Sequence, residues 1–220
     1  MKRGVISLVL AMVVGFILNG CAASTAMSNK NTTKKSRIIF DVSDKYDVEK
    51  IKSALTNAVS ERVPNLRENE NFFPDSLPEK PSKPVYKNMF GGLGAMAKGN
   101  PQFEMMSLNT SNAYYTISGN GGMDSGFNRK IEVYKGAIYP YKKGYRIYLY
   151  LFYEEGTDGL MGTLTKTMVD SIVGEDGALL YMAQVRDAFL KEIPDATIIS
   201  QSPRKLTKLN LNTIGFKKSN

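Results

Sequence analysis

The chain of 220 residues contains no histidine, no tryptophan and a single cysteine. Without histidine it lacks the usual general base of serine and cysteine hydrolases, the most common protein ligand of zinc and the ordinary pH switch. Catalysis would have to depend on carboxylates, lysines, tyrosines and serines, and the sequence singles out no pair of them. We therefore expect no catalytic residue, no cofactor and no metal site, with a hydrolase that uses two distant carboxylates as a less favoured alternative.

The chain also lacks an apolar run long enough to cross a bilayer. Its longest run covers the fourteen residues from Val5 to Leu18, interrupted only by Ser7 and Gly15, whereas a transmembrane helix needs about 20 residues. Lys2 and Arg3 precede the run. A charged start followed by a short apolar run is typical of a signal peptide.

Four residues at the end of this run resemble the lipobox of bacterial lipoproteins: Leu18, Asn19, Gly20 and Cys21. The resemblance implies removal of residues 1–20 and attachment of acyl chains to Cys21. An unpaired thiol is unusual in an exported protein, because oxidising compartments favour disulfides, and acylation would account for it. The alternatives are an ordinary secretory signal with a chance cysteine and a cytosolic protein with an apolar N-terminal helix.

The residue after Cys21 is Ala22, which is similar to the pattern of lipoproteins sorted to the outer membrane. We therefore expect a lipid-anchored protein of the cell outer membrane that faces the periplasm, with another bacterial membrane surface as the alternative. Two or three acyl chains would make release from the bilayer very slow. The mature chain would carry a net charge of +6, because the removed part holds two basic residues and no acidic one. These basic residues are scattered, and an exported protein is not expected to bind nucleic acid.

The mature chain divides into a tether and one folded domain. Residues 21–36 are mainly Ala, Ser, Thr, Asn and Lys, a composition that predicts a flexible tether. Residues 37–216 are expected to form a single α+β domain that starts with a strand over 37–42. Apolar residues at spacings of three and four predict a helix over 48–63, ended by Pro64.

A proline-rich excursion follows this helix. Five of the nine prolines lie between residues 64 and 84, which predicts largely irregular structure over residues 64–110. Phe72 and Phe73 lie at its centre. Adjacent phenylalanines favour docking over free disorder, because a fully solvated loop gains nothing from them.

Strand patterns dominate the next part, over residues 113–118, 130–139 and 145–154, and the last two are expected to form a hairpin. In the third strand Tyr148, Tyr150 and Phe152 share one face, while the other face is also apolar. This pattern predicts a central strand with helices on one face and another cover over the tyrosines. Helices are then predicted over 160–172 and 176–193, followed by a strand over 196–200 and an edge strand over 209–216. The whole pattern predicts an α+β fold, with a mostly antiparallel sheet and about three helices packed on it.

Two short motifs suggest chemistry that their context does not favour. Gly92, Gly94 and Ala97 match a dinucleotide-binding fingerprint, but they follow a proline-rich stretch without a buried strand. Asp124 and Ser125 resemble the nucleophile loop of serine proteases, but no histidine is available to accept the proton. A flexible loop and a glycine-rich turn are the better interpretations.

The aromatic residues are the best remaining indication of function. Tyrosines cluster on the predicted strands, and tyrosine is favoured both at protein interfaces and in half-buried sheets. We predict a non-catalytic protein-interaction module that contacts another envelope protein, with a lipid- or glycan-binding carrier or sensor as the alternative. The candidate surface consists of Tyr148, Tyr150, Phe152, Phe72 and Phe73.

Overall fold

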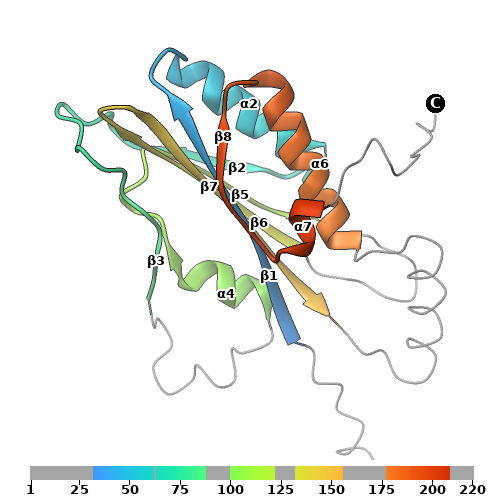
Figure 1. The fold of residues 1–220 in the computed structure, drawn as a ribbon. Coiled ribbons are helices and arrows are strands. Elements are labelled where there is room, and N and C mark those ends of the chain that lie inside the picture. The colour runs from blue at the N-terminus through green and yellow to red at the C-terminus, as the bar shows by residue number, and fades with distance from the viewer. Residues whose placement is uncertain (1–31, 62, 88–99, 122–131, 156–176, 209–220) are drawn as a thin grey trace, which may run out of the picture.

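The computed structural model describes residues 32–61, 63–87, 100–121, 132–155 and 177–208. One antiparallel sheet lies at its centre, with helices α2 and α6 on one face and helix α4 on the other (Figure 1). This arrangement confirms the predicted α+β class. Within the described part of the chain, no helix has both the length and the apolar character needed to span a membrane. The proposed signal peptide and Cys21 lie outside these residues.

The main sheet has six strands in the order β2-β5-β6-β7-β1-β8. All pairings between neighbours are antiparallel. The strands are β1 (Thr32–Ser43), β2 (Arg67–Glu70), β5 (Tyr115–Gly121), β6 (Glu132–Tyr141), β7 (Gly144–Glu155) and β8 (Thr197–Ser202). The position of β7, between β6 and β1, confirms the prediction that this strand is central.

Helix α2 (Val48–Ser60) covers one face of the sheet. Asp47 begins the helix, because its carboxylate accepts a hydrogen bond from the Glu49 N–H at 3.0 Å. Ile51, Leu55 and Val59 recur at four-residue spacing and are fully buried, as an amphipathic helix requires.

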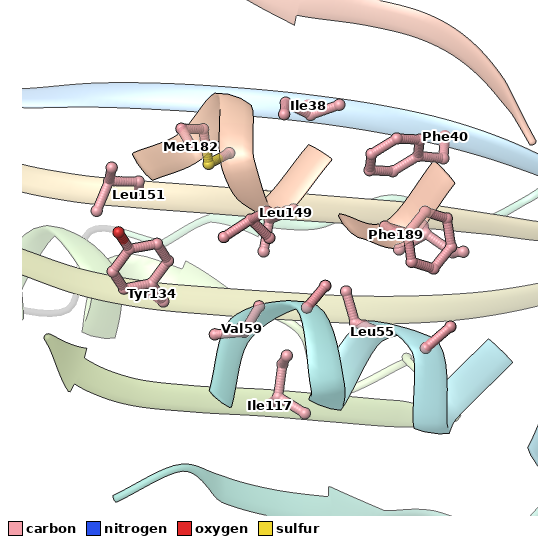
Figure 2. Close-up of a cluster of buried hydrophobic side chains, with 14 of the residues drawn as sticks. Ile38, Phe40, Leu55, Val59, Ile117, Tyr134, Leu149, Leu151, Met182 and Phe189 are labelled. Carbon is pink, nitrogen blue, oxygen red and sulfur yellow. The ribbon is translucent and has the colours of Figure 1, made fainter. Parts of the chain in front are cut away.

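Helix α6 (Gly177–Glu192) packs beside α2 on the same face of the sheet. The Phe189 ring lies 4.7 Å from the ring of Phe40, measured between centroids. Figure 2 shows these side chains converging with Leu149 and Leu151 of β7 on a single apolar core. Helix α7 (Lys205–Lys208) closes this end of the core with the buried side chain of Leu206.

The opposite face of the sheet carries a second apolar cluster. It is covered by helix α4 (Pro101–Ser107) and the two-residue strand β4 (Leu108–Asn109), which pairs with β3 (Val85–Tyr86). Asn100 begins α4 by accepting a hydrogen bond from the Gln102 N–H at 2.9 Å. Leu108 is buried in this cluster and Met105 packs against it. The sheet is therefore covered on both faces, as the largely apolar composition of β7 predicts.

Several predicted boundaries need correction. The expected tether over 21–36 is wrong at its end, because β1 starts at Thr32 and pairs with β7 from there onward. Backbone hydrogen bonds hold this polar segment in the sheet independently of its side chains. The segment 64–110, predicted to be largely irregular, contains β2, β3, β4 and α4. The hairpin turn falls on Lys142 and Lys143, because β6 ends at Tyr141, two residues later than expected, and β7 starts at Gly144, one residue earlier than expected.

Some predictions fall outside the described residues. These are the helix over 160–172, the edge strand over 209–216, the glycine motif at Gly92 and the loop at Ser125. The predicted helix over 176–193 and strand over 196–200 correspond to α6 and β8.

Candidate functional site

Three predicted site residues form a stack on the α4 side of the sheet. The rings of Tyr148 and Tyr150 are 6.5 Å apart and those of Tyr150 and Phe152 are 6.0 Å apart, with interplanar angles of 8° and 10°. Alternate residues of one strand point to the same side, which places the three rings in a row. Their exposed fractions are only 8%, 6% and 0%.

These three side chains therefore do not form the exposed surface that the sequence suggested. Leu108 and Ala113 are buried against them, and Met105 of α4 packs on the same cluster. The predicted cover over the tyrosines is present, and it removes them from solvent. A partner could reach them only if α4 moved away, so we place the contact surface elsewhere.

Polar groups surround the aromatic stack. Arg146 donates a hydrogen bond to Asp41 at 3.0 Å, and the Tyr141 hydroxyl donates to the same carboxylate at 2.9 Å. Burial, and then the Asp41 carboxylate, raise the pKa of Tyr141. This cluster ties β1, β6 and β7 together at the end of the sheet near the hairpin turn.

Two basic residues lie opposite Tyr150 on its neighbouring strands, Arg37 on β1 and Lys135 on β6. The Lys135 ammonium group donates to the Leu108 carbonyl at 2.6 Å, which ties β4 to the sheet. Burial lowers the pKa of Lys135. The cover over the stack is therefore held by polar bonds as well as by apolar contacts.

A groove of about 290 Å³ opens beside this cluster, between the sheet and the proline-rich segment. Its lining combines prolines, aromatic rings and small polar side chains: Asn71, Phe72, Pro74, Pro78, Ser82, Ser111, Asn112, Ala113, Tyr114, Tyr139 and Pro140. Open concave sites lined by apolar rings with a few polar groups are typical of binding sites.

Tyr139 is the unusual member of this lining. The residue is 1% exposed, and among the residues that the structure describes its hydroxyl oxygen has no hydrogen-bond partner. Burial raises the pKa of Tyr139, so the hydroxyl stays protonated in the physiological range. A buried hydroxyl without a partner is costly, and such a group is normally explained by strain, by an ordered water or ion, or by a functional role.

Phe72 is one of the residues that line the groove, and Phe73 follows it in the chain. The side chain of Phe72 is 100% exposed, and that of Phe73 is 42% exposed with its ring edge-on to Tyr114 at 5.0 Å. The preceding residue, Asn71, is fixed by two hydrogen bonds. Its backbone N–H donates to the Tyr114 carbonyl at 2.8 Å and its amide group donates to the Ala113 carbonyl at 2.7 Å.

The far end of the proline-rich segment is also attached to the sheet. The backbone N–H of Lys142 donates to the Pro78 carbonyl at 3.0 Å, and the Lys142 side chain forms an ion pair with Glu79. The segment between Asn71 and Glu79 is thus fixed at both ends. Phe72 is an exposed apolar ring on an anchored support.

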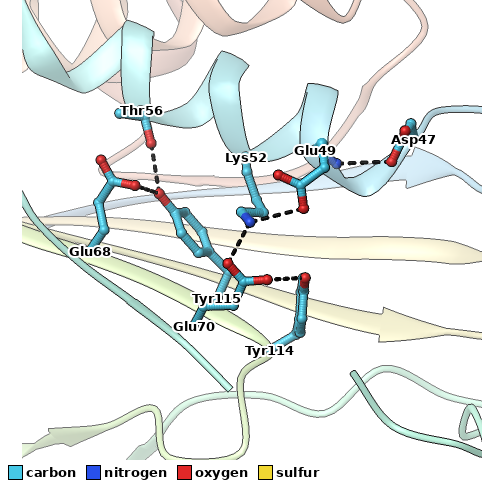
Figure 3. A network of polar contacts seen from close by, with 8 residues as sticks. All are labelled: Asp47, Glu49, Lys52, Thr56, Glu68, Glu70, Tyr114 and Tyr115. Atoms are coloured by element: carbon cyan, nitrogen blue, oxygen red, sulfur yellow. Dashed lines mark hydrogen bonds and ion pairs between the residues drawn. The ribbon is translucent and has the colours of Figure 1, made fainter. Parts of the chain in front are cut away.

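A polar network behind the groove positions Tyr114 and the start of this segment (Figure 3). The Lys52 ammonium group lies 2.5 Å from Glu70 and 2.9 Å from Glu49. Glu70 also accepts a hydrogen bond from the Tyr114 hydroxyl. Glu70 directly precedes Asn71, so these bonds connect helix α2 to the base of the segment that carries Phe72.

A second branch of the network holds Tyr115. Its hydroxyl donates to Glu68 and lies 2.9 Å from the Thr56 hydroxyl. Helix α2 and the edge strand β2 are therefore connected at two points, one through Lys52 and one through Thr56. The short strand β2 exposes every side chain, so this network is its main attachment besides its backbone pairing with β5.

Protonation in the network follows its geometry. Burial acts to lower the pKa of Lys52, but hydrogen bonds to Glu70 and Glu49 outweigh it and raise that pKa above its ordinary value. The hydrogen bond from Lys52, followed by the one from Tyr114, lowers the pKa of Glu70. Burial, and then the hydrogen bond to Glu70, raise the pKa of Tyr114 to about 12. At neutral pH the network is therefore a set of satisfied ion pairs, and its role is structural.

No known protein family, curated protein sequence or solved structure matches this chain. Within the described ranges, no group of three or more Cys, Asp or Glu residues is placed to hold a metal ion. The arrangement can offer exposed apolar rings and a groove to a partner. The sequence indicated Phe72 and Phe73 but not the groove, because Tyr139 and Asn71 meet only in the folded chain.

Proposed function

We propose that this protein is a lipid-anchored protein of the bacterial envelope that acts as a non-catalytic interaction module. The anchor is supported by the lipobox-like residues Leu18–Cys21 and by the absence of any other cysteine in the chain. The proposed location is the periplasmic face of the outer membrane, supported by Ala22 after the cysteine. Intact mass of the native protein tests the anchor. Loss of residues 1–20 with added acyl chains is expected, and a free thiol or a retained Met1 would contradict it.

The contact surface that we propose is the groove, which Phe72 lines, together with the adjacent Phe73. The observation that carries this proposal is the complete exposure of Phe72 on a segment that is bonded to the sheet on both sides. An exposed phenylalanine on a fixed support loses little conformational entropy when it enters a pocket of a partner. Large aromatic side chains of this kind commonly contribute most of the binding energy at interfaces.

A quantitative pull-down tests this surface. The mature lipidated protein serves as bait for solubilised envelope membranes, beside the variants Phe72→Ala and Ile199→Ala. Ile199 is the matched control, because it is also an exposed apolar residue, at 49%, but lies on the edge strand β8. A partner that is lost by at least about tenfold with Phe72→Ala and retained with Ile199→Ala would support the proposal. Equal capture by all three proteins would contradict it.

One observation favours a carrier or sensor of lipid or glycan as the second candidate. The Tyr139 hydroxyl has no partner among the described residues and its residue lines the groove. A bound molecule could satisfy it only where neighbouring side chains move aside, because the hydroxyl has no exposed surface, and a volume of about 290 Å³ lies at the small end for ligand pockets. Native mass spectrometry of the purified protein would show a co-purifying molecule that Tyr139→Phe weakens. A protein without added mass would leave the interaction module as the better account.

A further inference from the structure

A second exposed apolar surface lies away from the groove, on strand β3 and helix α4. The described residues include seven large apolar side chains that are exposed, and four of them belong to these two short elements. We call these four residues the β3–α4 patch: Val85 (53% exposed), Tyr86 (45%), Phe103 (37%) and Met106 (47%). Clustered apolar exposure of this kind indicates a contact surface.

The local structure places the two helical members of the patch on one side of α4. Phe103 and Met106 are three residues apart in α4, so they point to the same side of the helix. Met105 points instead toward the aromatic cluster of the sheet. Strand β3 lies beside the end of α4, because Tyr86 pairs with Leu108 and the Lys87 N–H donates to the Ser107 carbonyl at 2.8 Å. Val85 and Tyr86 are consecutive in β3, so they point to opposite sides of the strand. The exposed side of α4, with Phe103 and Met106, is the outer surface of the layer that covers the sheet.

The surroundings of the patch are mainly basic. The Lys35 ammonium group lies 4.8 Å from the centre of the Tyr86 ring, and Lys87 directly follows β3. The side chains of both lysines are exposed. Glu104 is the acidic residue within α4. Apolar residues flanked by lysines match the interface of an anionic bilayer, where rings enter the headgroup layer and ammonium groups contact lipid phosphates.

The length of chain between the proposed anchor and the sheet brings this patch near the membrane. Ten residues separate Cys21 from the start of β1 at Thr32, which limits the distance between the two to about 40 Å. Lys35, which contacts Tyr86, lies three residues into β1, or about 10 Å from its start. The start of β1 lies at the α4 end of the molecule (Figure 1).

We propose that the β3–α4 patch rests on the anionic phospholipid bilayer that holds the anchor, with Phe103 and Met106 in the headgroup layer. The inference rests on the proposed lipid anchor at Cys21. The patch and the groove lie on separate elements, so a domain that rests on this patch keeps the groove free for a protein partner. The anchor then sets the distance to the membrane, and the patch sets the orientation.

The chain contains no tryptophan, so a single introduced tryptophan serves as a fluorescent probe of the patch. Full-length Phe103→Trp protein, processed and acylated in cells, is reconstituted into vesicles of phosphatidylethanolamine and phosphatidylglycerol, with or without bromine on the acyl chains. The sole tryptophan should lose about half of its emission to the brominated lipid, because interfacial side chains reach about 5–10 Å into the bilayer. Met106→Trp repeats the measurement at a second patch position. Ile199→Trp is the control and should lose little emission.

The role of charge is tested in the Phe103→Trp protein. Adding Lys35→Glu and Lys87→Glu should reduce quenching in vesicles with phosphatidylglycerol, whereas Lys50→Glu and Lys191→Glu on the helical face should leave it unchanged. If the acylated Phe103→Trp protein emits equally in vesicles with and without brominated lipid, this inference is overturned, while the anchor stays intact. Blue-shifted but unquenched emission would show that the tryptophan is buried by protein and not by lipid. That result would also overturn this inference. Protein that lacks acyl chains by intact mass would overturn the anchor and this inference together.

Discussion

Replacing Tyr139 with phenylalanine removes one buried oxygen atom from a residue that lines the groove. Among the described residues that oxygen has no hydrogen-bond partner, although the residue is 1% exposed. Burying a hydroxyl without a bond costs about 1–3 kcal/mol. Tyr139→Phe keeps the ring and its edge-on contact with Tyr148 at 5.6 Å. We therefore expect the variant to be more stable than the native protein, by about 1 kcal/mol in the free energy of unfolding.

The neighbouring tyrosine on the same face of β6 provides a matched control. The Tyr141 hydroxyl lies 2.9 and 3.1 Å from the two oxygens of the Asp41 carboxylate. Tyr141→Phe loses a bond to a charged acceptor and leaves Asp41 with one partner fewer, which we expect to cost about 1–2 kcal/mol. The two substitutions have the same chemistry and lie two positions apart, so they should change stability in opposite directions.

Urea unfolding followed by far-ultraviolet circular dichroism measures both changes. The expected difference between the two variants is about 2–3 kcal/mol, which is well above the error of linear extrapolation. A loss of stability with Tyr139→Phe as large as that with Tyr141→Phe would show that the Tyr139 hydroxyl has a partner, and would refute the reasoning. If the hydroxyl serves the groove, the more stable Tyr139→Phe protein should also capture less partner, since functional groups often cost stability.

Three further outcomes follow from the fold. Gly144→Ala should destabilise the protein by about 3 kcal/mol or more in urea unfolding, because Gly144 has φ of +135° and an added Cβ would lie 2.0 Å from the Val42 carbonyl oxygen. Unchanged stability would contradict this geometry of the turn between β6 and β7. Phe189→Ala should cost about 3–5 kcal/mol by the same assay, because it opens a cavity against Phe40 in the main core; a cost below about 1 kcal/mol would contradict that packing. Stability should fall as pH rises from about 10 to about 12, because unfolded tyrosine ionises near 10 while folded Tyr114 keeps its proton to a pKa of about 12. Tyr114→Phe should reduce this fall. Identical pH profiles of stability for the native protein and the variant would count against the burial of Tyr114.

The central strands were predictable from sequence because β7 carries apolar residues on both of its faces. Alternation separates Leu149 and Leu151 from Tyr148 and Tyr150, and the structure places the first pair in the helical core and the second under α4. Periodicity fixes which side chains share a face. It contains no information about how completely that face is covered, which is why the tyrosines were assigned to an exposed surface.

The start of the sheet was missed because its composition is polar. Residues 32–36 read Thr, Thr, Lys, Lys and Ser, which on composition alone predicts a tether. Pairing with β7 supplies backbone hydrogen bonds over the whole segment, and Ser36 donates to the Ser202 carbonyl at 3.0 Å. Long-range pairing therefore overrides local propensity at this position.

The groove depends on contacts between distant parts of the chain. Asn71 reaches Ala113 and Tyr114, and Pro78 reaches Lys142. The proline density predicted an irregular segment, and the two phenylalanines predicted docking, but neither pattern specifies a support. The sequence therefore indicated Phe72 and Phe73 as candidate contact residues, and only the fold shows the groove beside them.

Photocrosslinking in living cells tests the central claim most directly. A photoreactive phenylalanine at position 72 is compared with the same residue at position 199, which is also exposed but lies on β8. The proposed interaction surface predicts one dominant crosslinked envelope protein from position 72 and no corresponding product from position 199. A diffuse background from position 72, or the same product from both positions, would contradict it.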